Sequence, residues 1–323
     1  MKVRLTGPLG KFIKPHLELR RSPGYELRTA EIILDQFDAY AAESFPDCQT
    51  VTRPMITGYL QKIPNLQPVT RHGQLSVLRQ FCRFLFQLDP RVYIPECHLL
   101  PAAKSDFQPH IYTLNEVVQL MDAARRLPPA GSLRPHTYST LIGLLWSSGL
   151  RGGELVRLNL ENVDLEKGVL HICQTRNFKS RLVPLADSAR VALVAYRDLR
   201  ERLGMGQSPQ SPFFINERKH RCASRTVIGT FRMLTRQPGL TPAYGREPRL
   251  HDLRHTWATR CLSGIYQSGQ DPNAALPALA TYPGHVNIAC TTICLHPDTD
   301  LLVRAGARFE DYVTATATGG CHE

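Results

Sequence analysis

The sequence predicts a mainly α-helical protein of two domains, the second of which carries a small antiparallel β-sheet. Three observations support this fold class. The chain has 323 residues, which is long for one compact core. Several segments place apolar residues at helical spacing. Only the region 163–185 indicates short strands, with Glu-Lys-Gly as the turn between the first two.

Helices dominate the predicted N-terminal domain, residues 1–108. Residues 1–22 contain proline and glycine and are predicted to be a lead-in. The segments 25–45, 52–63 and 70–88 are predicted helices, because their apolar residues fall on one face. The stripes contain Leu27, Ile32, Leu34, Phe37 and Tyr40 in the first segment, and Leu75, Leu78, Phe81, Cys82 and Leu85 in the third.

The predicted second domain covers residues 109–323, and a proline-rich stretch at 89–112 is predicted to link it to the first. Thr113 and Glu116 form a capping box, which indicates that a helix begins there. The next predicted elements are a buried helix, a glycine turn and a second helix (137–158), the strand segments 163–174 and 179–185, and a helix (188–203).

The charge balance favours a polyanionic partner such as nucleic acid. Lysine and arginine exceed aspartate and glutamate by 11, which gives a field that attracts polyanions. Residues 1–108 hold 14 basic and 10 acidic residues, and the remainder holds 25 and 18. Both domains are therefore basic, as expected if both contact the same polyanion. A basic surface that serves only solubility is the alternative.

Composition excludes two broad classes of protein. No apolar run is long enough to cross a membrane, and the first 21 residues lack the apolar core of a signal peptide. The nine cysteines are scattered and contain no Cys-x-x-Cys pair, so they indicate reduced thiols. We therefore expect a cytoplasmic protein rather than a membrane protein or a disulfide-bonded secreted one.

Three segments carry residues suited to phosphodiester chemistry. Arg151 follows an apolar helix at a glycine-rich break. His251 and Arg254 are three residues apart and share a helix face. His285 lies in a third segment, Gly-His-Val-Asn-Ile-Ala-Cys. Two arginines and two histidines could hold a phosphodiester, stabilise charge on its oxygens and transfer protons near neutral pH. A single arginine or histidine is usually structural, so the prediction depends on the whole set.

These segments resemble the boxes of the tyrosine recombinase (phage integrase) family. "SGLRGGEL" resembles the first arginine box, "HDLRHTWAT" the His-x-x-Arg-His box, and "TYPGHVNIACTTICLHPDTDLL" the third box. The resemblance covers roughly residues 18–312. It implies that 1–108 is a helical core-binding domain and that 109–323 is an α-rich catalytic domain. The implied function is site-specific recombination or integration of mobile DNA.

The resemblance also implies a reaction and partners. In this family a tyrosine attacks a phosphodiester, forms a 3′-phosphotyrosyl link and releases a 5′-hydroxyl. The reaction needs no metal and no other cofactor. The expected partners are double-stranded DNA and further copies of the chain, in the family's synaptic tetramer, and no membrane.

Individual residues take roles from the same resemblance. Arg151 and Arg254 would clamp the scissile phosphate. His251 would assist proton transfer, and His285 would hydrogen-bond the phosphate in the transition state. Glu154 would hold the first box in place.

Two positions depart from the family's pattern. The family's nucleophilic tyrosine lies nine residues after the histidine of the Gly-His pair, and that position is Cys294. Cysteine is a soft nucleophile toward phosphorus, and its side chain is shorter. The family's hairpin lysine, which protonates the leaving oxygen, corresponds to Arg176. An arginine pKa above about 12 makes that residue a poor proton donor.

These departures leave alternatives open. Tyr312 could supply the nucleophile from a displaced segment, or Cys294 could act itself. His285, Cys290, Cys294 and His296 could bind a metal, although their spacing is not a familiar zinc pattern. The main functional alternative is a non-catalytic DNA-binding protein, either a decayed recombinase or a regulator that occupies a site.

Overall fold

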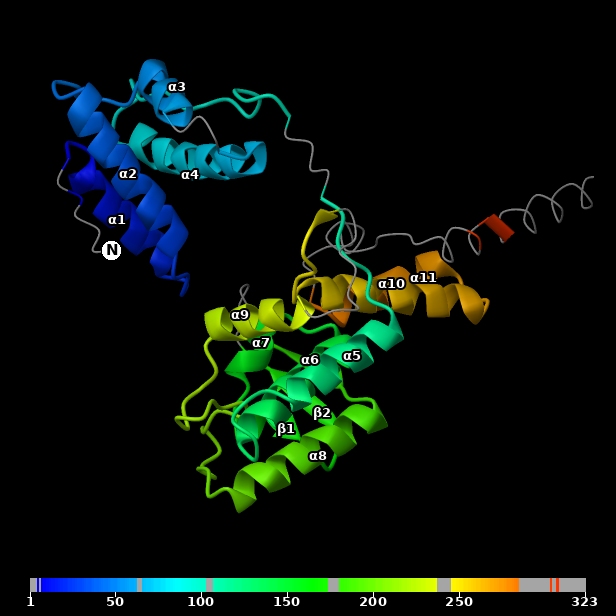
Figure 1. Ribbon diagram of the computed structural model, residues 1–323. Coiled ribbons are helices and arrows are strands. Elements are labelled where there is room, and N and C mark those ends of the chain that lie inside the picture. The colour runs from blue at the N-terminus through cyan, green and yellow to red at the C-terminus, as the bar shows by residue number, and fades with distance from the viewer. Residues whose placement is uncertain are drawn as a thin grey trace, which may run out of the picture. The chain divides into compact units, whose positions relative to one another are not determined.

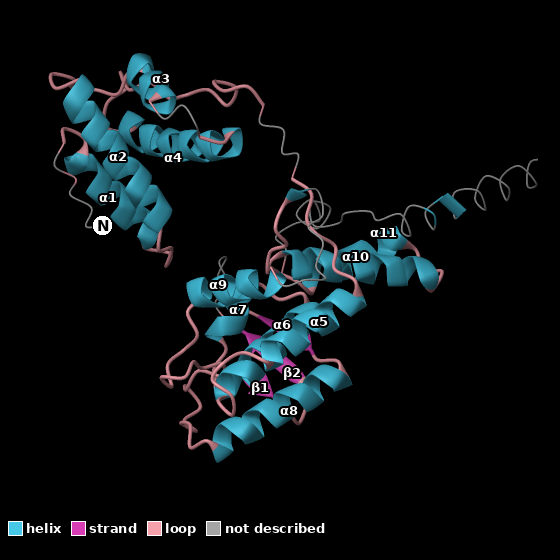
Figure 2. Ribbon diagram, in the orientation of Figure 1, coloured by secondary structure: helices cyan, strands magenta, loops and turns pink. Residues whose placement is uncertain are grey.

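The computed structural model describes residues 5, 7–62, 66–102, 107–173, 180–236, 245–284, 303 and 306–307. Over these residues the chain is mostly helical and has one small antiparallel sheet, which confirms the predicted fold class (Figures 1 and 2). The chain divides into two compact units, 1–107 and 108–323. The separate functions assigned to the two domains stay predictions. In the described part of the chain, no helix has the length and apolar character to span a membrane.

The first unit is a set of helices around one apolar core. Each helix turns one face inward, and aromatic and aliphatic side chains from all of them are buried together. The predicted helices at 25–45, 52–63 and 70–88 are confirmed. The helices are α1 (Gly10–Arg21), α2 (Arg28–Ser44), α3 (Arg53–Gln61) and α4 (Pro68–Phe86).

The lead-in predicted for residues 1–22 is wrong, because most of it forms helix α1. Pro15 lies inside the helix and has no amide hydrogen to donate. A contact that is distant in sequence holds the start of this helix. The buried carboxylate of Asp38, on α2, accepts hydrogen bonds from the amides of Gly7 and Leu9, both at 2.8 Å. A side chain of α2 therefore caps the start of α1.

Part of the predicted linker packs against the first unit. Arg79 on α4 donates a hydrogen bond to the carbonyl of Pro95 at 2.8 Å. The amide of Tyr93 donates to the carbonyl of Val51 at 2.9 Å. At the other end of this stretch, Tyr112 belongs to the core of the second unit.

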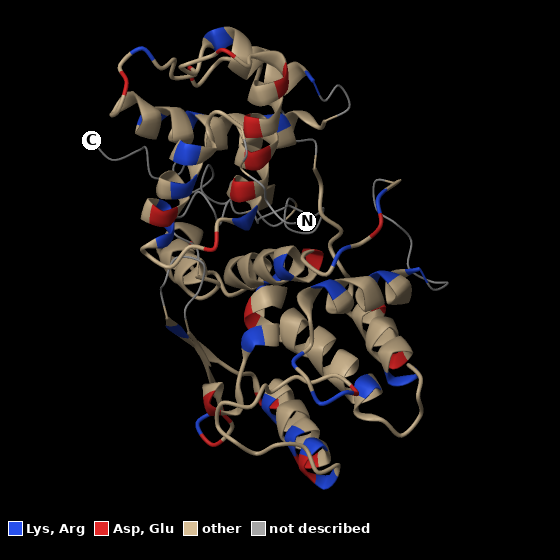
Figure 3. Ribbon diagram, turned by 90° about the vertical axis from the view of Figure 1, so that its left-hand side faces the viewer, with Lys and Arg blue, Asp and Glu red and all other residues tan. Residues whose placement is uncertain are grey.

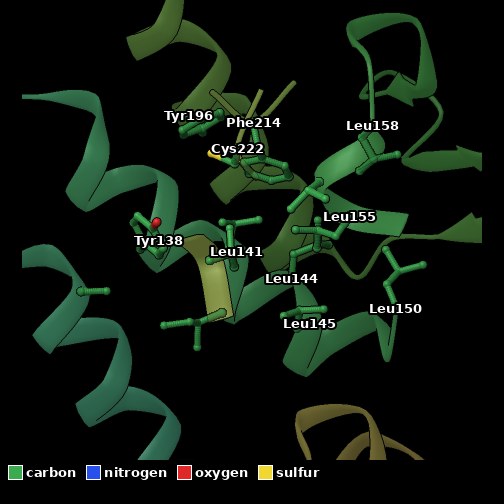
Figure 4. Packing of buried hydrophobic residues seen from close by; sticks show 14 of the residues in the cluster. Tyr138, Leu141, Leu144, Leu145, Leu150, Leu155, Leu158, Tyr196, Phe214 and Cys222 are labelled. Atoms are coloured by element: carbon green, nitrogen blue, oxygen red, sulfur yellow. The ribbon is translucent and has the colours of Figure 1, made fainter. Parts of the chain in front are cut away.

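The second unit surrounds helix α6. Most residues of this helix are buried, and α5, α8 and α10 pack against it. Figure 4 shows Leu141, Leu144 and Leu145 of α6 against Leu155 of α7. The helices are α5 (Leu114–Arg125), α6 (Leu133–Ser148), α7 (Gly152–Arg157), η1 (Leu160–Asn162), α8 (Asp187–Arg202), α9 (Ser224–Thr235), α10 (Asp252–Gln267) and α11 (Pro272–Thr281).

A small sheet completes the second unit. Its strands run in the order β1-β2-β3, and both neighbouring pairs are antiparallel. Leu170 pairs with Val183, and both side chains are buried in the unit's core. The predicted strands are thus confirmed, and the predicted capping box at Thr113 and Glu116 is formed. The strands are β1 (Val163–Asp164), β2 (Val169–Ile172) and β3 (Arg181–Pro184).

Candidate active site

Arg151 is placed by the sharp change of direction between α6 and α7. After Ser148 ends α6, Gly149 adopts a left-handed conformation with φ of +59°. A Cβ atom on Gly149 would lie 2.4 Å from ring atoms of Trp257, so both the backbone and the space require glycine. Leu150 is buried. Arg151 then starts α7 as its N-cap residue, with a side chain that is 37% exposed.

The carboxylate of Glu154 joins two arginines. It accepts hydrogen bonds from Nη1 of Arg151 at 2.9 Å and from the amide of Arg151 at 3.1 Å. Nη1 and Nη2 of Arg181 donate to the same carboxylate at 3.2 and 2.8 Å. Only 2% of the Glu154 side chain is exposed. The two arginines therefore have their directions set by one buried anion.

The electrostatics of Glu154 keep it ionised. Burial alone raises the pKa of this carboxyl, because a charge is costly away from water. The hydrogen bonds and positive charge of Arg181, followed by those of Arg151, more than offset burial and lower the pKa to about 2. Glu154 is thus a fixed negative charge at neutral pH.

Arg254 lies in the first turn of α10 and is buried. Its Nη1 donates to the carbonyl of Gly149 at 2.8 Å, and its Nη2 donates to the carbonyl of Pro283 at 2.9 Å. Arg254 therefore joins the end of α6 to the turn that follows α11.

The structure brings Arg151 and Arg254 together at one oxygen atom. Nη1 of Arg151 also reaches the carbonyl of Pro283, at 3.4 Å, and its Nη2 reaches the carbonyl of Gly284 at 3.3 Å. Two guanidinium groups that are 103 residues apart in sequence thus share one acceptor oxygen. Paired guanidiniums of this kind suit the oxygens of a phosphate group.

His251 precedes α10 and is exposed to solvent. Its pKa is lowered from 6.5 to about 4, first by partial loss of hydration and then by the nearby groups His255, Arg254 and Arg249, against a smaller opposing effect of Asp252. The rings of His251 and His255 lie 5.1 Å apart and perpendicular to each other. His251 is therefore neutral at pH 7 and has a ring nitrogen that can accept a proton.

Arg151 and His251 line the same cavity, which has a volume of about 360 Å³. Its other basic side chains are Arg232, from α9, and Arg249, just before α10. Arg249 forms an ion pair with Asp252 at 2.9 Å. The cavity thus gathers three arginines and His251 beside apolar residues of α9, and its positive charge suits an anionic group.

The sequence analysis missed three of these arginines. Arg181 has no motif of its own, because its partners lie elsewhere in the chain. Arg232 lies on α9, whose apolar residues Val227, Phe231 and Leu234 recur at helical spacing and could have revealed the helix. Arg249 could have been found from its i,i+3 spacing to Asp252.

The other predicted site residues lie outside the described residues. These are Arg176, His285 and Cys294, together with the alternative nucleophile Tyr312 and the remaining members of the proposed metal set, Cys290 and His296. Among the residues that are described, no cluster of three or more histidine, cysteine, aspartate or glutamate side chains is placed to hold a metal ion.

Comparison with known proteins identifies the family. The sequence model of the phage integrase family matches residues 111–300. The integrase/recombinase y4rB of Sinorhizobium fredii is 35% identical over 304 residues, which cover 92% of this chain and 96% of the relative. A tyrosine recombinase XerC from Thermodesulfovibrio yellowstonii is 26% identical over 295 residues, which cover 89% of this chain and 91% of the relative.

Solved structures share the fold. XerH recombinase bound to a palindromic difH substrate matches with a TM-score of 0.66 and 17% identity, over 88% of this chain and 80% of that one. Lambda integrase, solved as a dimer on a COC′ core site, matches with a TM-score of 0.64 and 18% identity, over 88% and 94%. The family match and the similarity to y4rB over nearly the whole chain confirm the family that the sequence resembles, and the chain belongs to the phage integrase family of tyrosine recombinases.

Proposed function

We propose that this chain binds a specific duplex DNA site and recombines it, with Arg151 and Arg254 holding the scissile phosphate. The observation that carries this proposal is the shared acceptor: both guanidiniums reach the carbonyl oxygen of Pro283. The same pair can neutralise charge on phosphate oxygens when a strand is attacked. Arg151 offers the accessible guanidinium, because Arg254 is only 2% exposed.

Within the first arginine box, the guanidinium of Arg151 is held in a fixed orientation. Glu154 fixes Arg151 through two hydrogen bonds, one to the backbone and one to the side chain. Electrostatic catalysis is strongest when the charged groups need not reorganise during the reaction. We therefore assign Glu154 the role of orienting Arg151.

His251 is the described residue best suited to proton transfer. It is neutral at pH 7, because partial loss of hydration and the positive groups around it lower its pKa to about 4. A neutral imidazole can accept the proton of an attacking hydroxyl group and later return it. His251 shares its cavity with Arg151, so the base and the phosphate ligand face the same space.

Three further roles follow from the family pattern. Arg176 would stand at the proton-donor position, His285 would hydrogen-bond the phosphate, and Cys294 occupies the position of the nucleophile. Cleavage by the natural chain is impaired in this proposal, because cysteine attacks phosphorus poorly and arginine rarely gives up a proton.

The proposed partners are duplex DNA and other copies of the chain. Lysine and arginine lie on helices of both units, as Figure 3 shows. A lambda integrase of the same fold was solved as a tetramer bound to a Holliday junction, with a TM-score of 0.61. We propose that this chain also self-associates on DNA, and that it acts in the cytoplasm.

The first experiment identifies the DNA site by selection from a random duplex library. Affinity for the selected site is then measured at several salt concentrations. Several phosphate contacts should make the logarithm of the affinity fall linearly and steeply with the logarithm of the salt concentration. A flat response would contradict contacts from both basic units.

The second experiment tests cleavage on a nicked suicide substrate of that site. The wild-type chain should give no stable covalent product, Cys294→Tyr should give slow capture, and Cys294→Tyr with Arg176→Lys should be faster. The loss of a nucleophile should outweigh the loss of a proton donor, because general acid catalysis contributes only about 10²–10⁴-fold. The readout is a band that survives denaturant and disappears with protease.

Variants of the other candidates decide between the alternatives. If the wild-type chain gives the band and Cys294→Ala abolishes it, cysteine is the nucleophile. If Tyr312→Phe abolishes the band and Cys294→Ala does not, the register assignment is wrong. If the variant with both Cys294→Tyr and Arg176→Lys binds its site but gives no covalent band, the chain is a DNA-binding protein without strand-exchange activity.

A further inference from the structure

We propose that Arg181 is a positioning residue, which holds the turn Tyr282–Gly284, directly before His285 in the sequence, against the first arginine box. Arg181 lies outside the three boxes quoted above. The catalytic consequence rests on the proposed function of the site. The positioning itself can be tested without DNA.

Arg181 uses all three nitrogens of its guanidinium in contacts to two separate segments. Nη1 and Nη2 donate to the two carboxylate oxygens of Glu154 at 3.2 and 2.8 Å. Nε donates to the carbonyl of Tyr282 at 2.9 Å. The side chain is 11% exposed, so water competes little for these contacts. One side chain of β3 thus binds both the first box and the turn.

The turn is shaped to fit against this guanidinium. Gly284 has φ of +71°, a conformation that favours glycine. A Cβ atom at this position would lie 2.8 Å from Nη1 and 3.0 Å from Cζ of Arg181. Glycine is therefore needed here for its backbone conformation and for the close approach of the arginine.

Tyr282 carries two further contacts that hold the turn. Its ring stacks on Trp257 of α10, with centroids 5.0 Å apart and planes 17° apart. Its hydroxyl donates to the carbonyl of Pro184, at the end of β3, at 2.9 Å. The turn is thus held by α10 and by both ends of β3.

The position of Arg181 in the chain makes these contacts relevant to the reaction. The next residue after the turn is His285, and Arg176 lies five residues before Arg181. Both are predicted site residues outside the described part of the chain. Arg181 therefore fixes backbone that is close in sequence to His285 and to Arg176. Through Glu154 it is also connected to Arg151. A displacement of about 1 Å in such a group can cost about 10²-fold in rate.

Trp257 provides a direct readout of the turn. The chain has only two tryptophans, so Trp146→Phe leaves Trp257 as the sole indole. In this background we compare Arg181→Met, Arg181→Lys and the control Arg197→Met, which breaks an exposed ion pair with Asp198 on α8. The measurement is quenching of tryptophan fluorescence by acrylamide, well below the unfolding temperature.

Arg181→Met should increase quenching of Trp257, because the turn that covers the indole loses its hydrogen bond to the Arg181 side chain and keeps only the Tyr282 contact to β3. Lysine has one nitrogen and cannot bind the carboxylate and the Tyr282 carbonyl as arginine does. Arg181→Lys should therefore keep much of the thermal stability and still show increased quenching. Arg197→Met should leave quenching unchanged. Unchanged quenching in folded Arg181→Met protein overturns the proposal, and so does full restoration by lysine.

The catalytic consequence is measured in the Cys294→Tyr, Arg176→Lys background by covalent capture. Arg181→Met should lower the capture rate by about 10²-fold and leave affinity for the DNA site nearly unchanged. An unchanged capture rate contradicts positioning for the reaction. If no variant captures DNA while quenching still rises, the proposed function fails and the hold on the turn stands.

A double-variant comparison covers the case in which Arg181→Met does not fold. Gly284→Ala places a methyl group against the guanidinium. Gly284→Ala should raise quenching more in the chain that keeps Arg181 than in the Arg181→Lys background, because the amine of a lysine is flexible and can move aside. Equal effects in the two backgrounds contradict close packing of the arginine on the turn.

Discussion

Asp38 in the first unit and Glu154 in the second are both buried carboxylates, and they accept hydrogen bonds from different donors. Asp38 accepts from the backbone amides of Gly7 and Leu9. Glu154 accepts from the side chains of Arg151 and Arg181 and from one amide. The first carboxylate fixes the path of the chain at the start of a helix. The second fixes the directions of two cationic side chains, which a reaction on phosphate can use.

The largest expected effect comes from Glu154→Leu. Removal of one partner from a buried ion cluster leaves uncompensated charge and typically costs about 3–5 kcal/mol. Both tryptophans lie in the second unit, so urea unfolding followed by tryptophan fluorescence reports this loss. The control is Asp122→Leu, which breaks an exposed ion pair with Arg125 and should cost about 0–1 kcal/mol. Equal costs for the two variants would show that Glu154 contributes no more than a surface charge.

A smaller effect is expected from Asp38→Ala. It leaves two amides near the start of α1 without their acceptor, which should cost about 1–3 kcal/mol. The loss should appear in circular dichroism as earlier melting of the first unit. Tryptophan fluorescence and covalent capture by the Cys294→Tyr variants should stay unchanged per folded molecule. A fall in the capture rate at saturating DNA would contradict a purely structural role.

The smallest effect depends on pH and concerns His16. Burial, followed by the charge of Arg20, lowers the pKa of this histidine from 6.5 to about 4. The folded state therefore disfavours the protonated ring, and stability of the first unit should fall as pH decreases from about 6.5 to 4. His16→Phe removes this titration in a site lined by Phe81 and Phe84. The variant should melt higher than wild type at pH 5, and the difference between them should be smaller at pH 8 than at pH 5. A difference that is independent of pH would assign the effect to packing alone.

The sequence predicted the features that depend on local pattern. Arg151, His251 and Arg254 could be found because each lies in a short box, and the structure places all three in the second unit. Arg181 could not be found in this way, because its partners Glu154 and Tyr282 lie 27 and 101 residues away. Its importance follows from geometry that no short window of sequence contains.

The positions of most helices were predicted correctly, but the residues that each helix buries were predicted less well. Helix α1 was missed because its proline argues against a helix, and its cap comes from Asp38, about 30 residues away. On α2, Ile32 was assigned to the apolar stripe but is 44% exposed, whereas the adjacent Ile33 is buried. Neighbouring isoleucines have the same local preference, and packing against the other helices decides which of them is buried.

The shared oxygen of Pro283 has a consequence for the newly made protein. Arg151 and this oxygen are separated by 132 residues, so they meet only after the ribosome has synthesised most of the second unit. Contacts of such long range form late in folding, because a large loop must close first. A nascent, truncated or partly unfolded chain still carries basic helices that attract DNA, but its two arginines are not yet together. The paired guanidiniums that are proposed to hold a phosphate are therefore assembled only in molecules whose second unit has folded.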